Sequence, residues 1–183
     1  DIKVYEDPNR NNELVSISQG QIVDTIIKEY EKSNTGDNES IRDLFLTAPT
    51  GSGKSLLFQL PAFYVSSKGD VTIIVSPLIA LMKDQVRNLR DRGIKALAIY
   101  SGMSREEIVV ALENCIFGDY KFLYISPERL DTEIFQVKLR HMKVSMITVD
   151  ESHCISQWGY DFRPAYLKIA DIRKMLPNVP ILA

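Results

Sequence analysis

The sequence predicts an α/β domain in which a mainly parallel central sheet is flanked by helices. Two observations lead to this prediction. Runs of apolar and β-branched residues recur along the 183 residues, and they are continuously apolar rather than alternating, as expected of strands covered on both faces. Helical patterns separate these runs, and such alternation is typical of parallel strands joined by right-handed crossovers.

The predicted strands are residues 44–49, 71–77, 96–101, 121–127, 145–150 and 179–183. Between the third and fourth of them, Ser104 and Glu107 have the spacing of a capping box at the start of a helix, and Gly118 suits its far end. Other predicted helices cover residues 19–30, 56–65 and 78–92. The polar segment 33–40 is expected to be a loop.

Composition excludes several classes of protein. With 45% hydrophobic and 25% charged residues the chain is typical of a soluble globular domain, and its net charge of -2 gives no overall basic field for coating nucleic acid. The two cysteines, Cys115 and Cys154, form no disulfide framework, which favours a reducing, cytoplasmic compartment. No run reaches the length of a membrane span, so we expect no membrane partner. Because the sequence starts without Met and stops within an apolar run, we interpret it as part of a longer chain.

A phosphate-binding loop is predicted at "APTGSGKS", residues 48–55, between a strand and a helix. In such loops backbone N–H groups and a helix N-terminus hold phosphates, a Lys reaches the terminal ones and a Ser or Thr binds magnesium. Gly51 and Gly53 would permit the tight turn, Lys54 would be the phosphate cation and Ser55 the metal ligand. A flexible Gly–Ser turn that caps a helix is the alternative. The predicted nucleotide-binding residues here are Thr50, Gly51, Ser52, Gly53, Lys54 and Ser55.

An acid pair, Asp150 and Glu151, follows the predicted strand 145–150. Ligands of parallel sheets bind at the C-terminal ends of the strands. An Asp there can hold magnesium while the neighbouring Glu orients and deprotonates an attacking water, as phosphoryl transfer requires. Acids that favour the dipole of a helix N-terminus are the alternative. With Lys54 upstream, we predict Glu151 and Lys54 as catalytic and Asp150 with Ser55 as metal ligands.

Four stretches carry a family resemblance: "APTGSGKS…FQLPA", "VSPLIALMKDQV", "YISPERL" and "VDESHCISQWGYDFRPAY", in this order. In them the chain resembles the RecQ family of superfamily 2 DNA helicases, from about Ile17 onward. The resemblance implies a three-layer RecA-like P-loop fold, the first lobe of a two-lobed motor. Residues 17–183 would be this lobe, and residues 1–16 an N-terminal arm.

The segment behind the acid pair is rich in aromatic residues, and the resemblance gives it a role. In the family this loop senses single-stranded DNA and relays its presence to the ATP site. Trp158, Phe162 and Arg163 would then act at the DNA, while His153 and Gln157 would link the loop to the ATP site. Bases stacked on such rings gain about 1–3 kcal/mol each. Core packing is the alternative for the two aromatic residues.

Two predicted strands end in Ser-Pro, at Ser76-Pro77 and Ser126-Pro127. Groups at strand ends can hold DNA phosphates without reading sequence, and the resemblance favours that role for Ser76, Pro77 and Ser126. The alternative is turn chemistry, because Pro ends a strand in any case.

The resemblance implies that Gln21 is the adenine contact, because the family's adenine motif ends in Gln. Ile17 and Ser18 stand where the family has an aromatic residue and Arg. Other departures from the family pattern are Ser152 for Ala in the acid box and Tyr160 for His in the aromatic loop.

The predicted function is an ATP-dependent DNA helicase that uses ATP and Mg²⁺, and the resemblance alone implies its 3′-to-5′ direction. Its expected partners are single-stranded DNA, duplex or branched DNA and the second RecA-like lobe, with a location in the cytoplasm or nucleoid, or in the nucleus of a eukaryote. The lobe alone is expected to have little activity. Alternatives are an RNA helicase, a duplex translocase, and a non-catalytic module that binds DNA in response to nucleotide.

Overall fold

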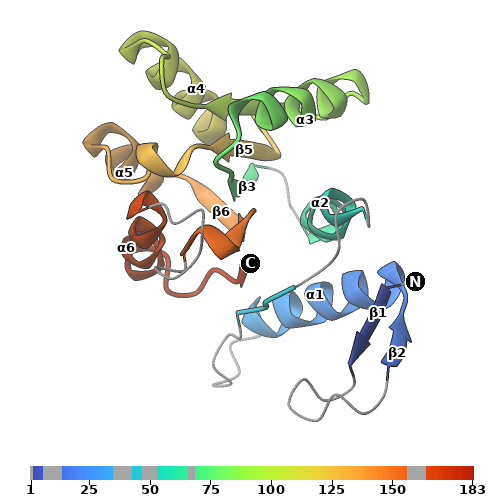
Figure 1. Ribbon diagram of the computed structural model, residues 1–183. Helices are drawn as coiled ribbons and strands as arrows, with labels where there is room; N and C mark the ends of the chain where they lie inside the picture. The colour runs from blue at the N-terminus through green and yellow to red at the C-terminus, as the bar shows by residue number, and fades with distance from the viewer. Residues whose placement is uncertain (1, 6–13, 35–42, 47–52, 66–68, 156–163) are drawn as a thin grey trace.

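The structure, a computed structural model, describes residues 2–5, 14–34, 43–46, 53–65, 69–155 and 164–183. Within them a five-stranded sheet has the order β4-β5-β3-β6-β7, and its neighbouring strands are all parallel (Figure 1). The strands are β3 (Asp70–Val75), β4 (Ala96–Ile99), β5 (Phe122–Ile125), β6 (Lys143–Val149) and β7 (Ile181–Leu182). The predicted α/β class with a parallel sheet is confirmed.

Helices cover both faces of this sheet, which makes three layers. The helices are α1 (Gln19–Asn34), α2 (Lys54–Val65), α3 (Ile79–Asp91), α4 (Arg105–Phe117), α5 (Glu133–Leu139) and α6 (Ile169–Met175). One buried cluster joins α1, α2 and α3 to side chains such as Ile74 and Tyr124, and a second joins α4, α5 and α6 to Ile73 and Ile125. Neighbouring residues of a strand face opposite layers, so each strand contributes to both cores.

The first predicted strand lies only partly within the described residues. Leu44 pairs with Leu182 in parallel, and its N–H donates to Ile181 O at 2.9 Å. The N–H of Leu46 donates to Ala183 O at 2.7 Å, so this segment extends the sheet beyond β7. Residues 47–49 lie outside the described part of the chain.

Several elements differ from the sequence-based expectation. Helix α1 runs to Asn34, so the first two residues of the predicted loop 33–40 are helical and the rest lie outside the described residues. The arm contains two antiparallel strands, β1 (Ile2–Tyr5) and β2 (Leu14–Ile17), which were not predicted. Nor were α5 and α6, which at seven residues each are too short for a clear helical period.

The predicted ends of α4 are confirmed. Ser104 Oγ accepts the N–H of Glu107 at 3.2 Å, and Glu107 Oε2 accepts the N–H of Ser104 at 2.7 Å. Gly118 follows the helix, and its N–H donates to Asn114 O at 2.8 Å. A Cβ on Gly118 would lie 2.7 Å from that same oxygen, so the close approach requires glycine here.

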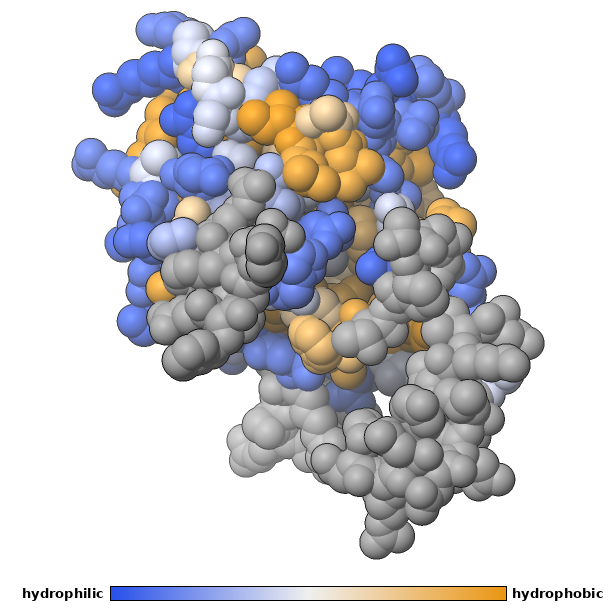
Figure 2. Space-filling model, in the orientation of Figure 1, coloured by the Kyte–Doolittle hydropathy of each residue, from blue (hydrophilic) through white to orange (hydrophobic). Residues whose placement is uncertain are grey.

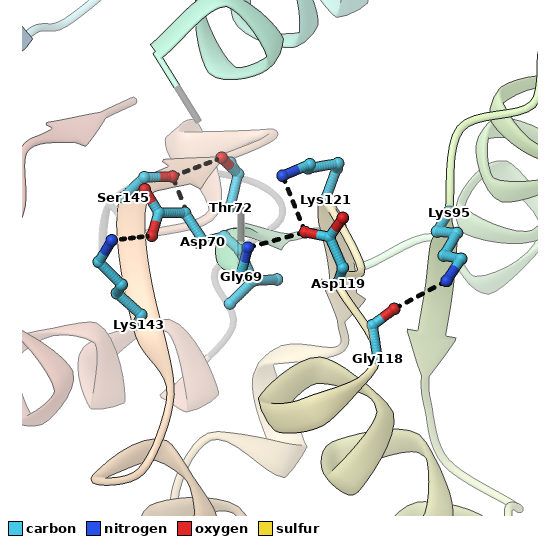
Figure 3. Close-up of polar contacts among 10 residues, drawn as sticks. Gly69, Asp70, Thr72, Lys95, Gly118, Asp119, Lys121, Lys143 and Ser145 are labelled. Atoms are coloured by element: carbon cyan, nitrogen blue, oxygen red, sulfur yellow. Dashed lines mark hydrogen bonds and ion pairs between the residues drawn. The ribbon is translucent and has the colours of Figure 1, made fainter. Parts of the chain in front are cut away.

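A polar network occupies the N-terminal edge of the sheet, where β3 and β6 begin (Figure 3). Lys143 Nζ lies 2.7 Å from Asp70 Oδ1, and the hydroxyls of Thr72 and Ser145 are 3.2 Å apart. Asp70 is 4% exposed, so its charge is buried beside an exposed partner. The network stabilises the edge opposite to the predicted nucleotide site.

In the same network, the exposed carboxylate of Asp119 gives a pH-dependent prediction. Hydrogen bonds from the Gly69 N–H at 2.7 Å and from Lys121 Nζ at 3.1 Å lower the pKa of Asp119 below its ordinary 3.8. A lowered pKa stabilises the fold above the ordinary value, and this stabilisation is lost as pH falls through the folded-state pKa. Asp119→Asn should therefore lower Tm slightly at pH 7, and the difference should shrink as the pH falls below the ordinary pKa of 3.8 and Asp119 becomes protonated in the folded state. Asparagine also tolerates the φ of 54° at this position.

Thermal unfolding followed by circular dichroism across this pH range measures the difference. Asp91→Asn, at the exposed end of α3, controls for the change of charge alone. A Tm difference that does not change with pH would show that the carboxylate charge of Asp119 is not the stabilising group.

The surface is largely hydrophilic in the view of Figure 2, with apolar residues in separate patches. Among the described helices, none combines the length and the apolar character needed to cross a membrane.

Candidate active site

The predicted functional residues meet at the C-terminal edge of the central sheet. Asp150 follows β6, Ser76 follows β3 and Ser126 follows β5, and β3 lies between the other two strands. Lys54 begins α2, on the face that carries α1 and α3. The strand order therefore brings three separate motifs to the edge where parallel sheets bind ligands.

A cavity of about 210 Å³ lies at this edge, between α2 and the end of β6. Lys54, Asp150, Glu151 and His153 all line it. Thr148 lines it as well, and its Oγ1 is buried without a hydrogen-bond partner among the described residues. A buried hydroxyl without a partner is a polar group available to a water or a ligand.

Within the described part of the chain, four hydrogen bonds hold Asp150. Its N–H donates to Val75 O at 2.9 Å, and its carbonyl accepts the hydroxyl of Tyr166 at 2.9 Å. Its carboxylate accepts Ser76 Oγ–H at 3.3 Å and the N–H of Glu151 at 3.1 Å. Burial, and then the charge of Glu151, raises the pKa of Asp150, while these donors and Lys54 act in the opposite direction. The carboxylate is therefore fixed in position, and a cation bound beside it would favour its charged form.

Glu151 has a left-handed backbone conformation, with φ of 54°. For a residue other than glycine this conformation is uncommon, and it is often found at functional sites. Its carbonyl accepts the N–H of Cys154 at 2.9 Å, and its Oε2 lies 3.2 Å from His153 Nδ1. The chain after β6 thus turns sharply and leaves the two carboxylates with separate sets of contacts.

The N-terminus of α2 carries the predicted phosphate and metal residues. Gly53 has φ of 81°, a left-handed conformation that favours glycine. A Cβ on it would lie 2.7 Å from Nε2 of Gln19, the end of a flexible side chain, so the turn rather than this approach selects glycine. Lys54 and Ser55 form the first turn of the helix, whose N–H groups and dipole favour anions. Gln85 Nε2 donates to Ser55 Oγ at 3.2 Å.

Gln21, the predicted adenine contact, lies in the first turn of α1 beside a second cavity of about 360 Å³. Its backbone N–H donates to Ser18 Oγ at 3.2 Å, and its Oε1 accepts the N–H of Ser18 at 2.8 Å. This is a capping box, so the Gln21 oxygen is already used by the helix end. Phe45 and Leu46 line both cavities, which places Gln21 next to the predicted phosphate site.

The predicted DNA contacts at the strand ends are more buried than the sequence suggested. Ser76 is 1% exposed and its hydroxyl faces Asp150, while Ser126 is 2% exposed and its Oγ has no partner in the described part of the chain. Pro77 is half-buried. The remaining predicted site residues lie outside the described residues: Thr50, Gly51, Ser52, Gln157, Trp158, Phe162 and Arg163.

The sequence matches the family of DEAD/DEAH box helicases over residues 19–182. The chain belongs to this family. Within it, the chain is 45% identical to the probable ATP-dependent DNA helicase RecS of Bacillus subtilis over 84% of its own length, and 42% identical to the ATP-dependent DNA helicase RecQ of the same organism over the same share. It spans 31% of RecS and 27% of RecQ. The resemblance of this helicase domain to RecQ proteins is confirmed.

The fold of the helicase domain is shared with more distant proteins. The solved structure of a hypothetical ATP-dependent RNA helicase from Sulfolobus tokodaii matches it with a TM-score of 0.63 at 18% identity, over 90% of this chain and 43% of that one. At this identity the match shows the fold alone, and it supports the RecA-like lobe predicted from the sequence.

The helicase domain has the oxygen donors that magnesium prefers. Asp150 offers a carboxylate and Ser55 a hydroxyl, and Mg²⁺ beside substrate phosphates commonly takes only one or two protein ligands. Among the described residues, no three His, Cys, Asp or Glu side chains form a metal-binding group. One carboxylate and one hydroxyl fit a metal that is held jointly with substrate phosphates.

Sequence reasoning missed the residues that support the predicted ones. The bonds of Ser76 and Tyr166 to Asp150 join positions that the fold alone brings together. Nothing in the sequence around Gln85, "LMKDQV", indicated that its side chain contacts Ser55. Thr148 could have been noticed as a hydroxyl within an apolar strand, "SMITVD".

Proposed function

We propose that this chain is the ATP-binding motor lobe of a DNA helicase in which single-stranded DNA stimulates hydrolysis of Mg-ATP. The observation that carries the proposal is the shared cavity, which Lys54 at the start of α2 borders together with Asp150 and Glu151 after β6. A cation for the phosphates and a carboxylate for the attacking water are central requirements of phosphoryl transfer. Membership of the DEAD/DEAH box helicases supports the same activity.

Each side chain would have a separate task. Lys54 would contact the terminal phosphates, and Glu151 would orient the attacking water and accept its proton. His153, 3.2 Å from the Glu151 carboxylate, would hold that carboxylate in place. Ser55 and Asp150 would hold magnesium, which when bound neutralises charge on the phosphates.

Contacts of the acid pair support a link to the aromatic-rich segment 156–163. Before that segment, the N–H of Cys154 donates to Glu151 O, and after it the Tyr166 hydroxyl donates to Asp150 O. Both flanks are thus bonded to peptide groups of the two acids. A chain of such contacts is the physical route by which a change at Trp158 could reach the carboxylates.

Relatives named as DNA helicases favour DNA as the partner. Because the chain spans less than a third of these relatives, unwinding, the 3′-to-5′ direction and contacts with duplex or branched DNA are proposals for the whole protein. An arginine from a second lobe is the usual group that completes such motors, and it contributes about 10³–10⁵ in rate. Turnover should therefore be measured on the full-length helicase.

An RNA helicase or a duplex translocase of the same superfamily is the second candidate. The fold is also that of a protein described as an RNA helicase, so the fold does not separate the two substrates. Stimulation of ATPase activity by single-stranded DNA and by RNA of the same sequence separates them directly.

Replacing Trp158 tests the proposed coupling. Trp158→Ala in the full-length helicase should keep the basal ATPase rate and reduce its stimulation by single-stranded DNA, because the ring is proposed to stack on a base rather than to touch ATP. Loss of one stacked base should weaken DNA binding by about 1–3 kcal/mol. The DNA concentration for half-maximal stimulation should then rise by about 5- to 150-fold. ATPase assays titrated with single-stranded DNA measure both quantities.

Phe117→Ala, at an aromatic residue that is 83% exposed at the end of α4, is the matched control and should change neither quantity. A Trp158 variant that melts several degrees lower and loses both activities together would instead identify the ring as core. Stronger stimulation by RNA than by DNA would favour the second candidate.

A further inference from the structure

Beneath the candidate site, four polar side chains form a continuous hydrogen-bonded series. Gln85 Nε2 donates to Ser55 Oγ at 3.2 Å, and Gln59 Nε2 donates to Gln85 Oε1 at 2.8 Å. Gln59 Nε2 also donates to the hydroxyl of Tyr124 at 2.9 Å. The series therefore runs from α2 to α3, back to α2 and on to β5. We refer to Ser55, Gln85, Gln59 and Tyr124 as the glutamine relay.

The need of a buried hydroxyl for a hydrogen-bond partner explains only part of the relay. Tyr124 is 2% exposed, and a buried phenol needs a polar partner, which Gln59 supplies. That need is met without Gln85. The bond from Gln85 to Ser55 instead occupies one lone pair of Oγ and leaves the other lone pair and the O–H proton for a metal and a phosphate. Gln85 thus orients the hydroxyl that the proposed function assigns to magnesium.

Two members of the relay belong to elements that adjoin strand ends of the site. Gln85 lies on α3, which follows Ser76 and Pro77 after Leu78, and Tyr124 on β5 stands two residues before Ser126. These are the strand ends predicted to contact DNA. Burial raises the pKa of Tyr124, the hydrogen bond with Gln59 opposes this rise, and the negative charge of Asp150, the second proposed metal ligand, adds to it.

We propose that Gln85 is a positioning residue for Ser55, and that Gln59 and Tyr124 connect this proposed metal ligand to the end of β5, where Ser126 is a predicted DNA contact. The inference rests on the proposed function. It adds a second connection between the DNA and ATP sites, separate from the aromatic-rich segment. A shift of β5 or α3 on DNA binding would change the Gln85–Ser55 contact and with it the affinity for magnesium.

The test is the Mg²⁺ dependence of ATP binding in the full-length protein. Gln85→Met keeps the length of the side chain and removes both hydrogen bonds. Loss of the bond to Ser55 should raise the Mg²⁺ concentration for half-maximal ATP binding by about three- to tenfold, with little change at saturating Mg²⁺. Gln136→Met replaces another half-buried glutamine, on α5 and distant from the site, and should leave the Mg²⁺ dependence unchanged.

Tyr124→Phe removes the far end of the relay. This variant should reduce the stimulation of ATPase by single-stranded DNA. Adding Gln85→Met to it should reduce the stimulation little further, because both substitutions break the same series of hydrogen bonds. If Gln85→Met does not fold, Gln85→Asn keeps the amide but is one methylene too short, and the same rise is expected.

An unchanged Mg²⁺ dependence in the folded Gln85 variants overturns the relay while the proposed function stands. Weaker ATP binding by the same factor at all Mg²⁺ concentrations also overturns it, since that result indicates general damage. If the double variant loses DNA stimulation by the sum of the two single losses, the connection between Gln85 and Tyr124 is excluded. Failure of the unaltered protein to bind ATP with Mg²⁺ overturns the proposed function and the relay together.

Discussion

Replacing Glu151 with Gln in the full-length helicase should leave ATP and DNA binding in place and lower ATP turnover by about 10²–10⁴-fold. Glutamine has nearly the shape of glutamate, but its neutral amide cannot accept a proton from the attacking water. The backbone should be undisturbed, because the carbonyl of residue 151 still accepts the N–H of Cys154 and its N–H still donates to Asp150. The left-handed φ of 54° costs both side chains about the same.

Steady-state ATPase assays with saturating single-stranded DNA measure turnover, and titration with a fluorescent ATP analogue measures binding. Glu106→Gln, at an exposed glutamate in the first turn of α4, makes the same chemical change far from the site. It should not affect turnover. Near-normal hydrolysis by Glu151→Gln would remove Glu151 from the role of base, and the raised pKa of Asp150 would make that residue the next candidate to examine.

The parallel sheet could be predicted because burial on both faces appears directly in the strands. All six residues of β3 are buried, and all four of β5. Their apolar runs stop at Ser76-Pro77 and Ser126-Pro127, where Pro provides no N–H for a further ladder bond. The two predicted strands were each two residues too long at this end, because the Ser and the Pro were counted within them.

The phosphate loop and the acid pair could be predicted because each is a local pattern with its own chemistry. Contacts between the motifs could not, because they depend on strand order. Ser76 and Asp150 are 74 positions apart, and they meet because β3 and β6 are neighbours. Gln59 and Tyr124 are 65 apart, and their contact depends on which face of β5 is covered by α2. No short pattern encodes such a pairing.

The backbone conformation of single residues could not be predicted from the sequence either. Nothing in "VDESHC" indicates that Glu151 has a positive φ. The preceding residue, Asp150, is bonded to Val75 and Tyr166, which only the fold brings next to it. Burial of Ser76 was missed for a related reason. Strand ends are commonly exposed, but here the carboxylate of Asp150 covers the hydroxyl. The same contact places a predicted DNA residue against a predicted metal ligand.

Lys54→Ala should abolish productive ATP binding. Lys54 is exposed at the first position of α2 and lines the cavity that contains both acids, so it is the cation placed to meet the phosphates. A hydrogen bond to a charged group contributes about 1.5–3 kcal/mol, which corresponds to at least about 10- to 150-fold weaker binding. The positive charge of Lys54 also opposes the rise in the pKa of Asp150. Its removal should move the acid limit of any residual Mg-ATP binding to higher pH, because Asp150 is then harder to ionise.

Fluorescence titration with an ATP analogue, at pH 7 and in more acidic buffer, measures both effects. Lys83→Ala removes a lysine from α3 that instead lies over the ring of Tyr100, 4.5 Å from its centroid. This control should bind ATP like the unaltered protein at every pH. Since alanine favours the helical conformation at position 54, a loss of binding cannot be attributed to unfolding of α2. If Lys54→Ala binds ATP within about twofold of the unaltered protein, Lys54 is excluded as the phosphate cation. Loss of a charged hydrogen bond would weaken binding by more than that.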